Sequence, residues 1–490
     1  MLDKIKQLTK DTVVYGVSTI IGRFLNFLLV PIYTYAFLPK EYGIQSQIYV
    51  FISILNVILL FGMDTAYMKY AVNVKDSDEE KRNFSTPYLT VMIVSFFICS
   101  FVILLKKPIF ALLVIPSDYY YIIFYTSLIL FLDSLTIIPF VKLRIERKAK
   151  KFALFKFLGI LLNITLNYIL IVKLKYLKLG VEAIFISNLA SSALTLILLS
   201  PSIFKSIKII IDLPILKKLL KFGLPFLPAG LSSIMIQGID RPILTQLTDL
   251  NTAGIYSANY KLGIFMMLFV SMFQYAWQPF FFQNAQEKNI KQVFSKILTY
   301  FTIAGSLILI FLSLFIDDIV KFHIIGRGTL IGSAYWGGLI IVPIILFGYL
   351  FNGIYYILSA GMFIEDKSTY IPIITGLGAA INVSVNFLLI PVWGIVGAAL
   401  ATLASYLIMA IAVYKITQRF YKINYEKRKV TTILSLIILA GAVYYYLMYI
   451  HKLFFTYKIF ILAGFITSLF LFVLDNNEKL FIKKKIGFKR

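Results

Sequence analysis

Long runs of apolar residues, separated by short polar stretches, make up almost the whole chain. A helix needs about 20 apolar residues to cross the hydrocarbon core of a membrane. We expect one spanning helix in each of fourteen runs: 12–38, 42–71, 86–105, 119–141, 152–172, 180–200, 222–246, 253–283, 293–316, 335–360, 369–390, 394–414, 430–450 and 455–474. The pattern predicts an all-α membrane protein with no room for a soluble domain.

The charge distribution supports this prediction and orients the chain. Only 14% of the residues are charged, whereas soluble proteins carry about 25%. Counting a charge close to the end of a span with the neighbouring connection, 35 of the 48 Lys and Arg residues lie in the termini and even-numbered connections, 10 in odd-numbered connections and 3 further inside spans. Because positive charge collects on the cytoplasmic side, we expect both termini in the cytoplasm. The net charge of +25 is therefore explained by positive residues on the cytoplasmic side of the membrane, and no nucleic-acid partner is expected.

Two parts of the sequence repeat each other. Residues 163–171, NITLNYILI, match residues 382–390, NVSVNFLLI, position by position in residue type. A helix that begins with glycine is predicted after each of these segments. The triplet Tyr42-Gly43-Ile44 likewise corresponds to Ala253-Gly254-Ile255. Such internal similarity is typical of a chain built from two copies of one unit.

The repeat predicts the domain organisation. We expect an N-terminal lobe at 1–204, a C-terminal lobe at 205–429, and two additional helices with a basic tail at 430–490. An even number of helices in each lobe leaves both lobes in the same orientation, related by an axis along the membrane normal. Two copies complete the architecture, so we expect a monomer.

The three cations counted inside predicted spans are Arg23, Arg241 and Lys261. A charge in such a position is costly and usually faces other protein groups or a water-filled cavity. Arg23 lies roughly 16 Å into the first span, at 1.5 Å per residue. We therefore expect a polar cavity in which these cations bind an anionic group. The alternative is structural: Arg23 pairs with a carboxylate, and Lys261 extends to the membrane surface.

Three carboxylates are candidates for cavity acids: Asp133, Asp240 and Asp64. Asp133 is as deep in its span as Arg23 and is the candidate partner of that arginine. Adjacent residues on a helix point about 100° apart, so we expect Asp240 and Arg241 not to neutralise each other simply. One of them would face the cavity. For Asp64 the favoured alternative is a carboxylate at a helix end or at the membrane interface.

No catalytic residue, metal site or cofactor is expected. The two histidines, His323 and His451, fall in connections without flanking carboxylates, and no GxxxxGK[ST] phosphate-binding loop occurs. ATP hydrolysis by this chain is therefore not expected.

Five segments in order resemble one family, the oligosaccharide flippases of the multidrug/oligosaccharidyl-lipid/polysaccharide exporter superfamily. They are YGVSTIIGRFLNFLLVPIYTYAFLPKEYG, LLFGMDTAY, QGIDRPIL, TAGIYSANYKLG and MFIEDKSTYIPIITGLGAAINVSVNFLLIPVWGIVGAAL. The resemblance implies two lobes around a V-shaped central cavity. The related lipid II flippases carry cavity arginines on the first and eighth helices, and Arg23 and Lys261 fall at those places. At the second place this chain has Lys261 instead of arginine, so a point charge replaces a side chain that can bind phosphate through two hydrogen bonds.

The resemblance also implies a function. The expected substrate is a polyprenyl-diphosphate-linked oligosaccharide, moved by alternating access from the inner to the outer leaflet of a prokaryotic plasma membrane for surface polysaccharide synthesis. Arg23, Arg241 and Lys261 would bind its anionic head group. Asp133, Asp240 or Asp64 would serve as a cavity acid or in coupling to H⁺ or Na⁺.

Two other functions stay open. A cation-coupled multidrug antiporter of the same superfamily would use Asp133 and Asp240, although three intramembrane cations and the two extra helices argue against it. An integral-membrane glycosyl- or acyltransferase would need a catalytic histidine or an Asp-rich metal site. The acidic stretch 76–80 is interleaved with basic residues and is typical of a solvated connection.

Overall fold

The computed structural model of the chain describes residue 16 and residues 20–71, 76–322 and 328–485. Within these ranges, twelve helices are long and apolar enough to cross a membrane. One of them, Tyr370–Phe420, contains two helices that meet at a kink at Gly394 (φ 52°, ψ −126°). A shorter apolar helix, Ile20–Ala36, falls in the first predicted span. The prediction of an all-α membrane fold with about fourteen helices is confirmed.

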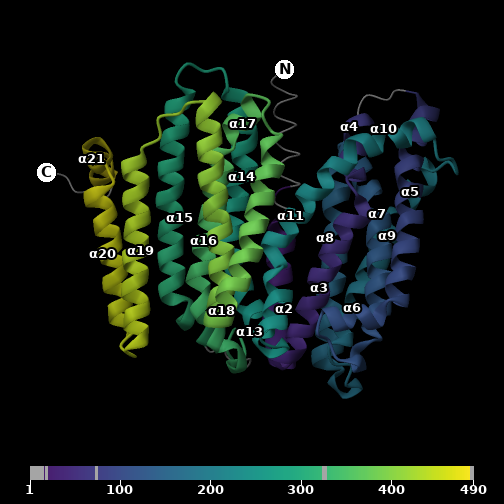
Figure 1. Cartoon of the computed structure of the whole chain (residues 1–490), viewed down its shortest axis with the longest axis horizontal. Helices are drawn as coiled ribbons and strands as arrows, with labels where there is room; N and C mark the ends of the chain where they lie inside the picture. The colour runs from purple at the N-terminus through teal and green to yellow at the C-terminus, as the bar shows by residue number, and fades with distance from the viewer. Residues whose placement is uncertain (1–15, 17–19, 72–75, 323–327, 486–490) are drawn as a thin grey trace. The chain divides into compact units, whose positions relative to one another are not determined.

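The helices follow one another with short connections, as labelled in Figure 1. The first half of the chain contains α2 (Leu29–Ala36), α3 (Pro39–Leu60), α4 (Met63–Ala71), α5 (Ser77–Leu104), α6 (Lys106–Leu112), α7 (Ile122–Ile145), α8 (Ala149–Asn167), α9 (Glu182–Ser206), α10 (Leu213–Gly223), α11 (Leu227–Gly238) and α12 (Asp240–Leu247). The second half contains α13 (Leu250–Tyr260), α14 (Ile264–Asn284), α15 (Ile290–Lys321), α16 (Val342–Leu358), α17 (Ala360–Ile364), α18 (Tyr370–Phe420), α19 (Lys427–Tyr449), α20 (Phe455–Phe472) and α21 (Asn476–Lys485).

Contacts divide the chain into two compact units. Unit 1 consists of Met1–Lys261, Ile331–Gly338 and Pro372–Thr402; unit 2 consists of Leu262–Leu330, Leu339–Ile371 and Leu403–Arg490. Unit 1 therefore includes α10 to α13 and the first part of α18. This division reports packing and does not follow the sequence repeat, so the lobe boundaries given by the repeat stay a prediction.

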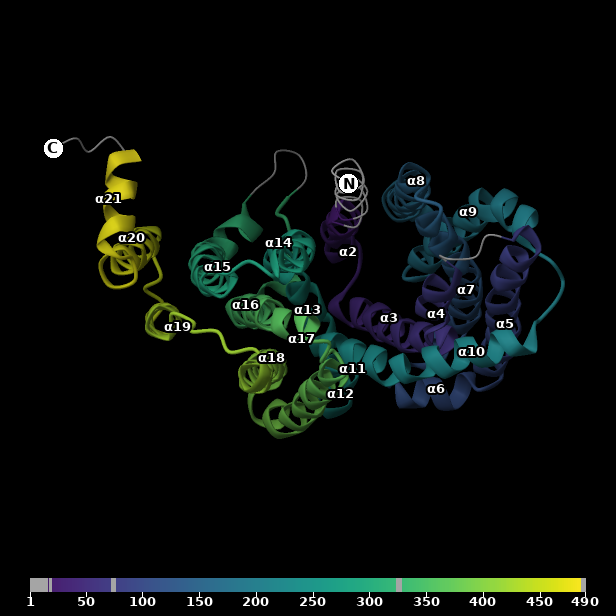
Figure 2. The same cartoon turned by 90° about the horizontal axis from the view of Figure 1, so that it is seen from above.

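In unit 1, long helices pack side by side around α7 and α3. The helix α7 contacts α5, α9 and α3, and α8 lies against α9 (Figure 2). The helix α3 also contacts α11, α12 and, most extensively, α13. Of these helices, α3, α8, α9, α11, α12 and α13 form walls of the polar site described below.

Two glycines at corresponding positions of the repeat hold α3 and α13 together. A Cβ atom on Gly43 would overlap the carbonyl oxygen of Leu250, and a Cβ atom on Gly254 would overlap that of Pro39. A Cβ on Gly254 would also lie 2.9 Å from the backbone nitrogen of Gly43. Small residues allow two helix backbones to approach this closely inside a membrane. The two copies of the repeat thus meet at the same motif.

The repeated asparagines also make the same contacts in both copies. The amide of Asn167 donates to the backbone oxygen of Asn163 at 2.8 Å and to its side-chain oxygen at 3.1 Å. The amide of Asn386 donates to the corresponding oxygens of Asn382, both at 2.9 Å. The sequence similarity therefore extends to local side-chain structure.

Three predicted spans are interrupted. The span 42–71 breaks at Phe61 and Gly62, which adopt φ values of 34° and 76°, and the backbone of Gly62 packs on that of Gly223. The span 222–246 is divided among several short helices, with prolines at 225 and 228 near the junctions. The span 253–283 is divided by a 3₁₀ turn, Lys261–Gly263. Hydropathy alone gives no signal for such interruptions.

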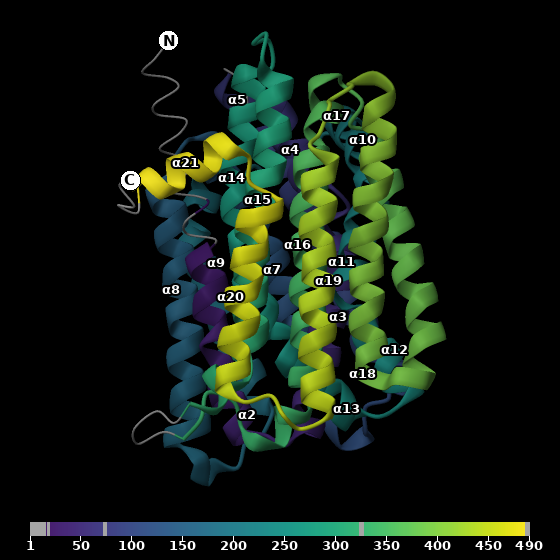
Figure 3. The ribbon, with the colours of Figure 1, turned by 90° about the vertical axis from the view of Figure 1, so that its left-hand side faces the viewer.

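In unit 2, α15 packs against α16, α19 and α20, and α19 packs against α20 (Figure 3). Ion pairs connect these helices near both ends. The Lys429 ammonium lies 2.6 Å from the Asp475 carboxylate and 3.3 Å from that of Glu478. Lys458 of α20 pairs with Asp318 of α15. The two additional helices are therefore a packed part of this unit.

The glycine contact generates a stability prediction. Overpacking a tight core costs about 1–3 kcal/mol, occasionally more, and the obstacle to a Cβ at Gly254 is backbone on a facing helix. We expect Gly254→Ala to lower the free energy of unfolding by about 3 kcal/mol, measured as a lower Tm of the detergent-purified protein. Gly464→Ala is the control, because a Cβ there meets nothing within 4 Å. Equal Tm values for both variants would contradict the prediction.

Candidate functional site

A polar cavity of about 540 Å³ lies within unit 1. Its walls come from the helix Ile20–Ala36 and from α3, α8, α9, α11, α12 and α13. Most of its lining side chains are polar. The lining residues are Asn26, Leu29, Tyr33, Gln45, Ser46, Tyr49, Val50, Ser53, Ile160, Asn163, Asn188, Ser191, Ile234, Gln237, Gly238, Arg241, Ser257 and Lys261. Two of the three predicted cations, Arg241 and Lys261, are therefore brought into one cavity.

Arg241 is held in place from several sides. One guanidinium nitrogen donates to the backbone oxygen of Gln237 at 2.7 Å and lies 3.1 Å from the Asp240 carboxylate. The guanidinium also lies over the ring of Tyr260, 4.4 Å from its centroid. Its backbone oxygen accepts a hydrogen bond of 2.9 Å from Gln47 of α3. The side chain is 12% exposed, so a fixed positive charge faces the cavity.

Asp240 has no exposed surface and acts as the counter-ion of Arg241. Its carboxylate accepts hydrogen bonds from the Arg241 backbone nitrogen at 2.9 Å and from the Tyr256 hydroxyl. The expectation that Asp240 and Arg241 do not neutralise each other was wrong, because the flexible arginine side chain reaches back to its neighbour. Arg241 is the member of the pair that lines the cavity.

Lys261 lines the same cavity from the start of the 3₁₀ turn between α13 and α14. Its ammonium lies 5.1 Å from the centroid of the Tyr42 ring. A cation over an aromatic face gains about 0.5–2 kcal/mol, depending on how far it is desolvated. The turn and the ring thus position a second cation beside Arg241.

Arg23 lies next to the residues that line the cavity. It is exposed on the helix Ile20–Ala36, and Asn26, one turn further on, lines the cavity. Residues three apart share a helix face. A Cβ atom on the neighbouring Gly22 would lie 2.9 Å from Ile160, which also lines the cavity. The role of Arg23 in anion binding stays a prediction.

The other two candidate acids, like Asp240, lie outside the cavity lining. Asp133 is half-buried on α7 and interacts with Ser192 and, electrostatically, with Lys156. Its proposed pairing with Arg23 stays a prediction. Asp64 is half-buried in the first turn of α4, where a carboxylate interacts favourably with the helix dipole. This position fits the structural alternative for Asp64.

Sequence reasoning missed several of the polar residues in the cavity wall. Tyr49 accepts a hydrogen bond of 3.0 Å from Asn188, and Tyr33 donates one of 2.8 Å to Asn167. The repeated asparagine motif was the available signal for this wall, since Asn163 belongs to it. Among the described residues, no group of three or more His, Cys, Asp or Glu side chains is placed to hold a metal ion.

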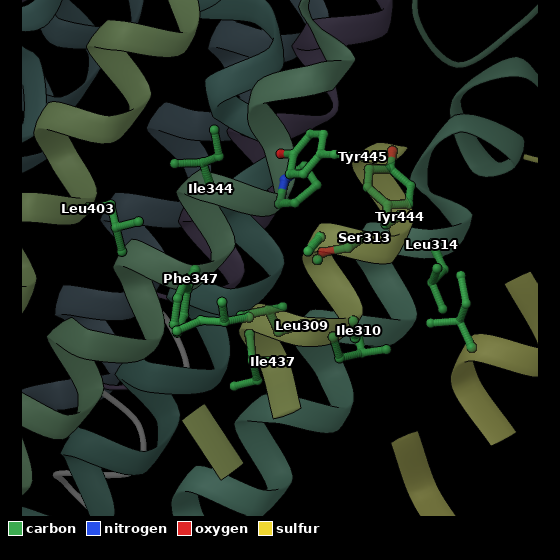
Figure 4. Close-up of a pocket in the computed structure, with 16 residues that line it drawn as sticks. Leu309, Ile310, Ser313, Leu314, Ile344, Phe347, Leu403, Ile437, Tyr444 and Tyr445 are labelled. Carbon is green, nitrogen blue, oxygen red and sulfur yellow. The ribbon is translucent and has the colours of Figure 1, made fainter. Parts of the chain in front are cut away.

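A second cavity, of about 300 Å³, lies within unit 2 and has a different character. Its lining comes from α15, α16, α18, α19 and α20 and is almost entirely apolar (Figure 4). The Tyr445 hydroxyl donates a hydrogen bond of 2.9 Å to the backbone oxygen of Ile340. This apolar cavity offers no charge to an anionic ligand.

Comparisons with known proteins agree with the fold and the sequence resemblance. A family model described as "Polysaccharide biosynthesis protein" matches residues 37–327. The lipid II flippase MurJ has a similar structure, with a TM-score of 0.72 and 17% identity, covering 97% of this chain and 100% of that one. A multidrug resistance MATE family transporter of the MOP superfamily gives a TM-score of 0.65 and 15% identity, covering 87% and 99%.

A Vibrio cholerae MATE transporter is also similar, with a TM-score of 0.60 and 14% identity, covering 84% of this chain and 97% of that one. At such identities, the structural likeness shows the fold alone. No curated protein sequence matches the chain.

The buried pair generates a second stability prediction. Removing one partner of a buried ion pair costs about 3–5 kcal/mol, whereas replacing both by apolar residues is often neutral. We expect Asp240→Leu to lower the Tm of the purified protein strongly, and the double variant Asp240→Leu/Arg241→Leu to regain most of it. Asp118→Leu, at an exposed carboxylate, is the control. A double variant as unstable as Asp240→Leu would show that the pair is not what stabilises this region.

Proposed function

Because the chain belongs to the family of polysaccharide biosynthesis proteins, we propose that it moves a polyprenyl-diphosphate-linked oligosaccharide across the membrane. The observation that carries this proposal is the position of Arg241 and Lys261 in one polar cavity. A diphosphate carries concentrated negative charge and cannot enter hydrocarbon unaided. Two fixed cations in a water-accessible cavity supply the charge that such a head group needs.

The remaining polar residues of the cavity suit the sugar part of the substrate. Amide side chains such as Gln45, Asn163 and Asn188 offer both donors and acceptors. A volume of about 540 Å³ lies within the range of small-molecule sites, roughly 300–1,000 Å³. It accepts the diphosphate and the first sugars, while the polyprenyl chain remains in the lipid.

The proposed transport cycle is alternating access without covalent chemistry. The head group enters from the cytoplasmic leaflet, binds the cations and leaves on the outer side of a prokaryotic plasma membrane, with both termini in the cytoplasm. We take the working unit to be a monomer. The family membership and the fold support this cycle, because transporters built from repeats bind substrate midway across the membrane.

Coupling to H⁺ or Na⁺ is part of the proposal, with Asp240 as the coupling group. Its carboxylate touches both Arg241 and Tyr256, so neutralising it would weaken its hold on the arginine. Asp133 and Asp64 are the other candidates. All three acids are absent from the cavity lining, but Asp240 is paired with Arg241, which does line the cavity. If Asp240 is the coupling group, transport by Asp240→Asn loses its dependence on an imposed pH or Na⁺ gradient. An unchanged dependence would exclude Asp240.

The second candidate function is a cation-coupled multidrug antiporter, favoured by the structural similarity to MATE transporters. The charges in the cavity argue against it. Arg241 and Lys261 line the wall, whereas the Asp240 carboxylate is fully buried behind them. A cationic drug entering this cavity would meet like charge.

The proposal predicts that the cations are needed for export. In cells whose own copy is replaced, Arg241→Gln, Lys261→Ala and Arg23→Ala should reduce surface polysaccharide at least tenfold and raise lipid-linked oligosaccharide facing the cytoplasm. Charge-assisted hydrogen bonds contribute about 1.5–3 kcal/mol each, which corresponds to roughly tenfold or more in binding. Protein levels are matched by immunoblotting of membranes.

Lys367→Ala, at an exposed lysine of a connection, is the matched control and should leave surface polysaccharide unchanged. If surface polysaccharide persists in all three cavity variants while export of cationic dyes fails, the flippase proposal is wrong and the antiporter replaces it.

A further inference from the structure

Lys156 is an intramembrane cation that falls within the predicted span 152–172 but was counted with the basic connection before it. The structure places it on α8, seven residues after the first residue of the helix, Ala149. At 1.5 Å per residue, this is about 10 Å from the helix start. The side chain is exposed, and its ammonium lies 4.3 Å from the centroid of the Phe140 ring on α7. A cation at this depth needs either a partner or a polar surrounding.

The helix geometry places Lys156 on the stripe of α8 that faces the polar cavity. Residues four and seven positions further on, Ile160 and Asn163, both line that cavity. Positions i, i+4 and i+7 lie within about 60° of one another around a helix. Lys156 therefore continues the cavity-facing stripe by one turn.

Lys156 lies at a different depth from Arg241. At the far end of α8, Asn167 bonds to Tyr33 near the end of the first helix. The backbone oxygen of Arg241 accepts a hydrogen bond from Gln47, which lies in the third turn of α3. Helix α3 begins just after the first helix ends. Lys156 is about 16 Å along α8 from Asn167. On the first helix, Gly22 meets α8 at Ile160, so Arg23 lies close to the depth of Lys156.

Asp133 connects Lys156 to the cavity wall. Its carboxylate on α7 interacts electrostatically with the Lys156 ammonium and with Tyr49, whose side chain lines the cavity. The acid thus supplies a counter-charge next to the cavity without lining it. Unlike the direct ion pair of Asp240 with Arg241, this interaction acts over a longer distance.

We propose that Lys156, with Asp133 as its resident counter-ion, forms a second anion-binding position of the cavity. This inference rests on the proposed function, and it specifies the path of the diphosphate. Asp133 holds the lysine when the position is empty. The diphosphate then competes with Asp133 for the lysine, and it passes between this position and Arg241 and Lys261. Two binding positions at different depths balance the negative charge of the diphosphate with cations while the cavity changes from facing the cytoplasm to facing the outside.

The test combines a transport measurement with a binding measurement on the full-length protein. Variants are Lys156→Gln, Lys156→Arg and the double variant Asp133→Asn/Lys156→Gln, with Lys151→Gln on the same helix as the control. Surface polysaccharide is measured in cells at matched protein levels. The Kd for farnesyl diphosphate and the Tm are measured on purified protein.

We expect Lys156→Gln to lower surface polysaccharide at least fivefold and to raise the Kd by a similar factor, and Lys156→Arg to restore both. The double variant removes both charges, so it should regain a Tm close to that of the unchanged protein while transport stays low. Lys151→Gln should behave as the unchanged protein does.

A double variant that regains transport together with its Tm would overturn the inference, because the pair would then be purely structural. Normal transport and Kd in Lys156→Gln would overturn it as well. Arg241→Gln separates this failure from failure of the proposed function. If Arg241→Gln still blocks export, only the second position is lost; if neither variant affects export, the flippase function itself fails.

Discussion

The close approach of α3 and α13 at Gly43 and Gly254 is the constraint on which the polar site depends. Only hydrogen fits in place of a side chain there, because each glycine faces the backbone of the other helix. The residues around this contact build the cavity. Tyr42 precedes Gly43 and lies under the Lys261 ammonium, and Gln47, one turn on, holds the backbone of Arg241. A wider spacing of the two helices would separate these partners.

The second requirement is that charges inside the membrane have partners within the protein. Asp240 and Arg241 form a pair supported by Tyr256 and Tyr260. A buried pair contributes little net stability, because desolvation offsets the attraction between its members. Its value here is placement, since the ion pair and the bond to the Gln237 backbone fix the guanidinium at the cavity wall. A ligand with a higher charge density than a carboxylate can compete with Asp240 for it.

Much of the fold follows from the sequence because hydropathy and charge alternation act over whole segments. The spans, the division between 369–390 and 394–414 and the repeated glycines and asparagines were all visible there. The break at Phe61 and Gly62 was not, because it depends on contact with Gly223 from a distant part of the chain. The side-chain geometry of Asp240 and Arg241 was also missed, because a long arginine can turn back on its neighbour. Lys156 was overlooked because it follows a cluster of lysines and was counted with them in the connection before α8.

The central claim is that this polar cavity carries the head group of a lipid-linked sugar across a bilayer. The most direct measurement uses purified protein in liposomes that contain a fluorescent polyprenyl-diphosphate-linked sugar, with a membrane-impermeant glycosidase added outside. The account predicts that the protein makes the inner-leaflet sugar accessible to the enzyme, whereas protein-free liposomes keep about half of it protected. Continued protection of that half with correctly folded protein under an imposed H⁺ or Na⁺ gradient, together with uptake of a cationic dye by the same liposomes, would contradict it.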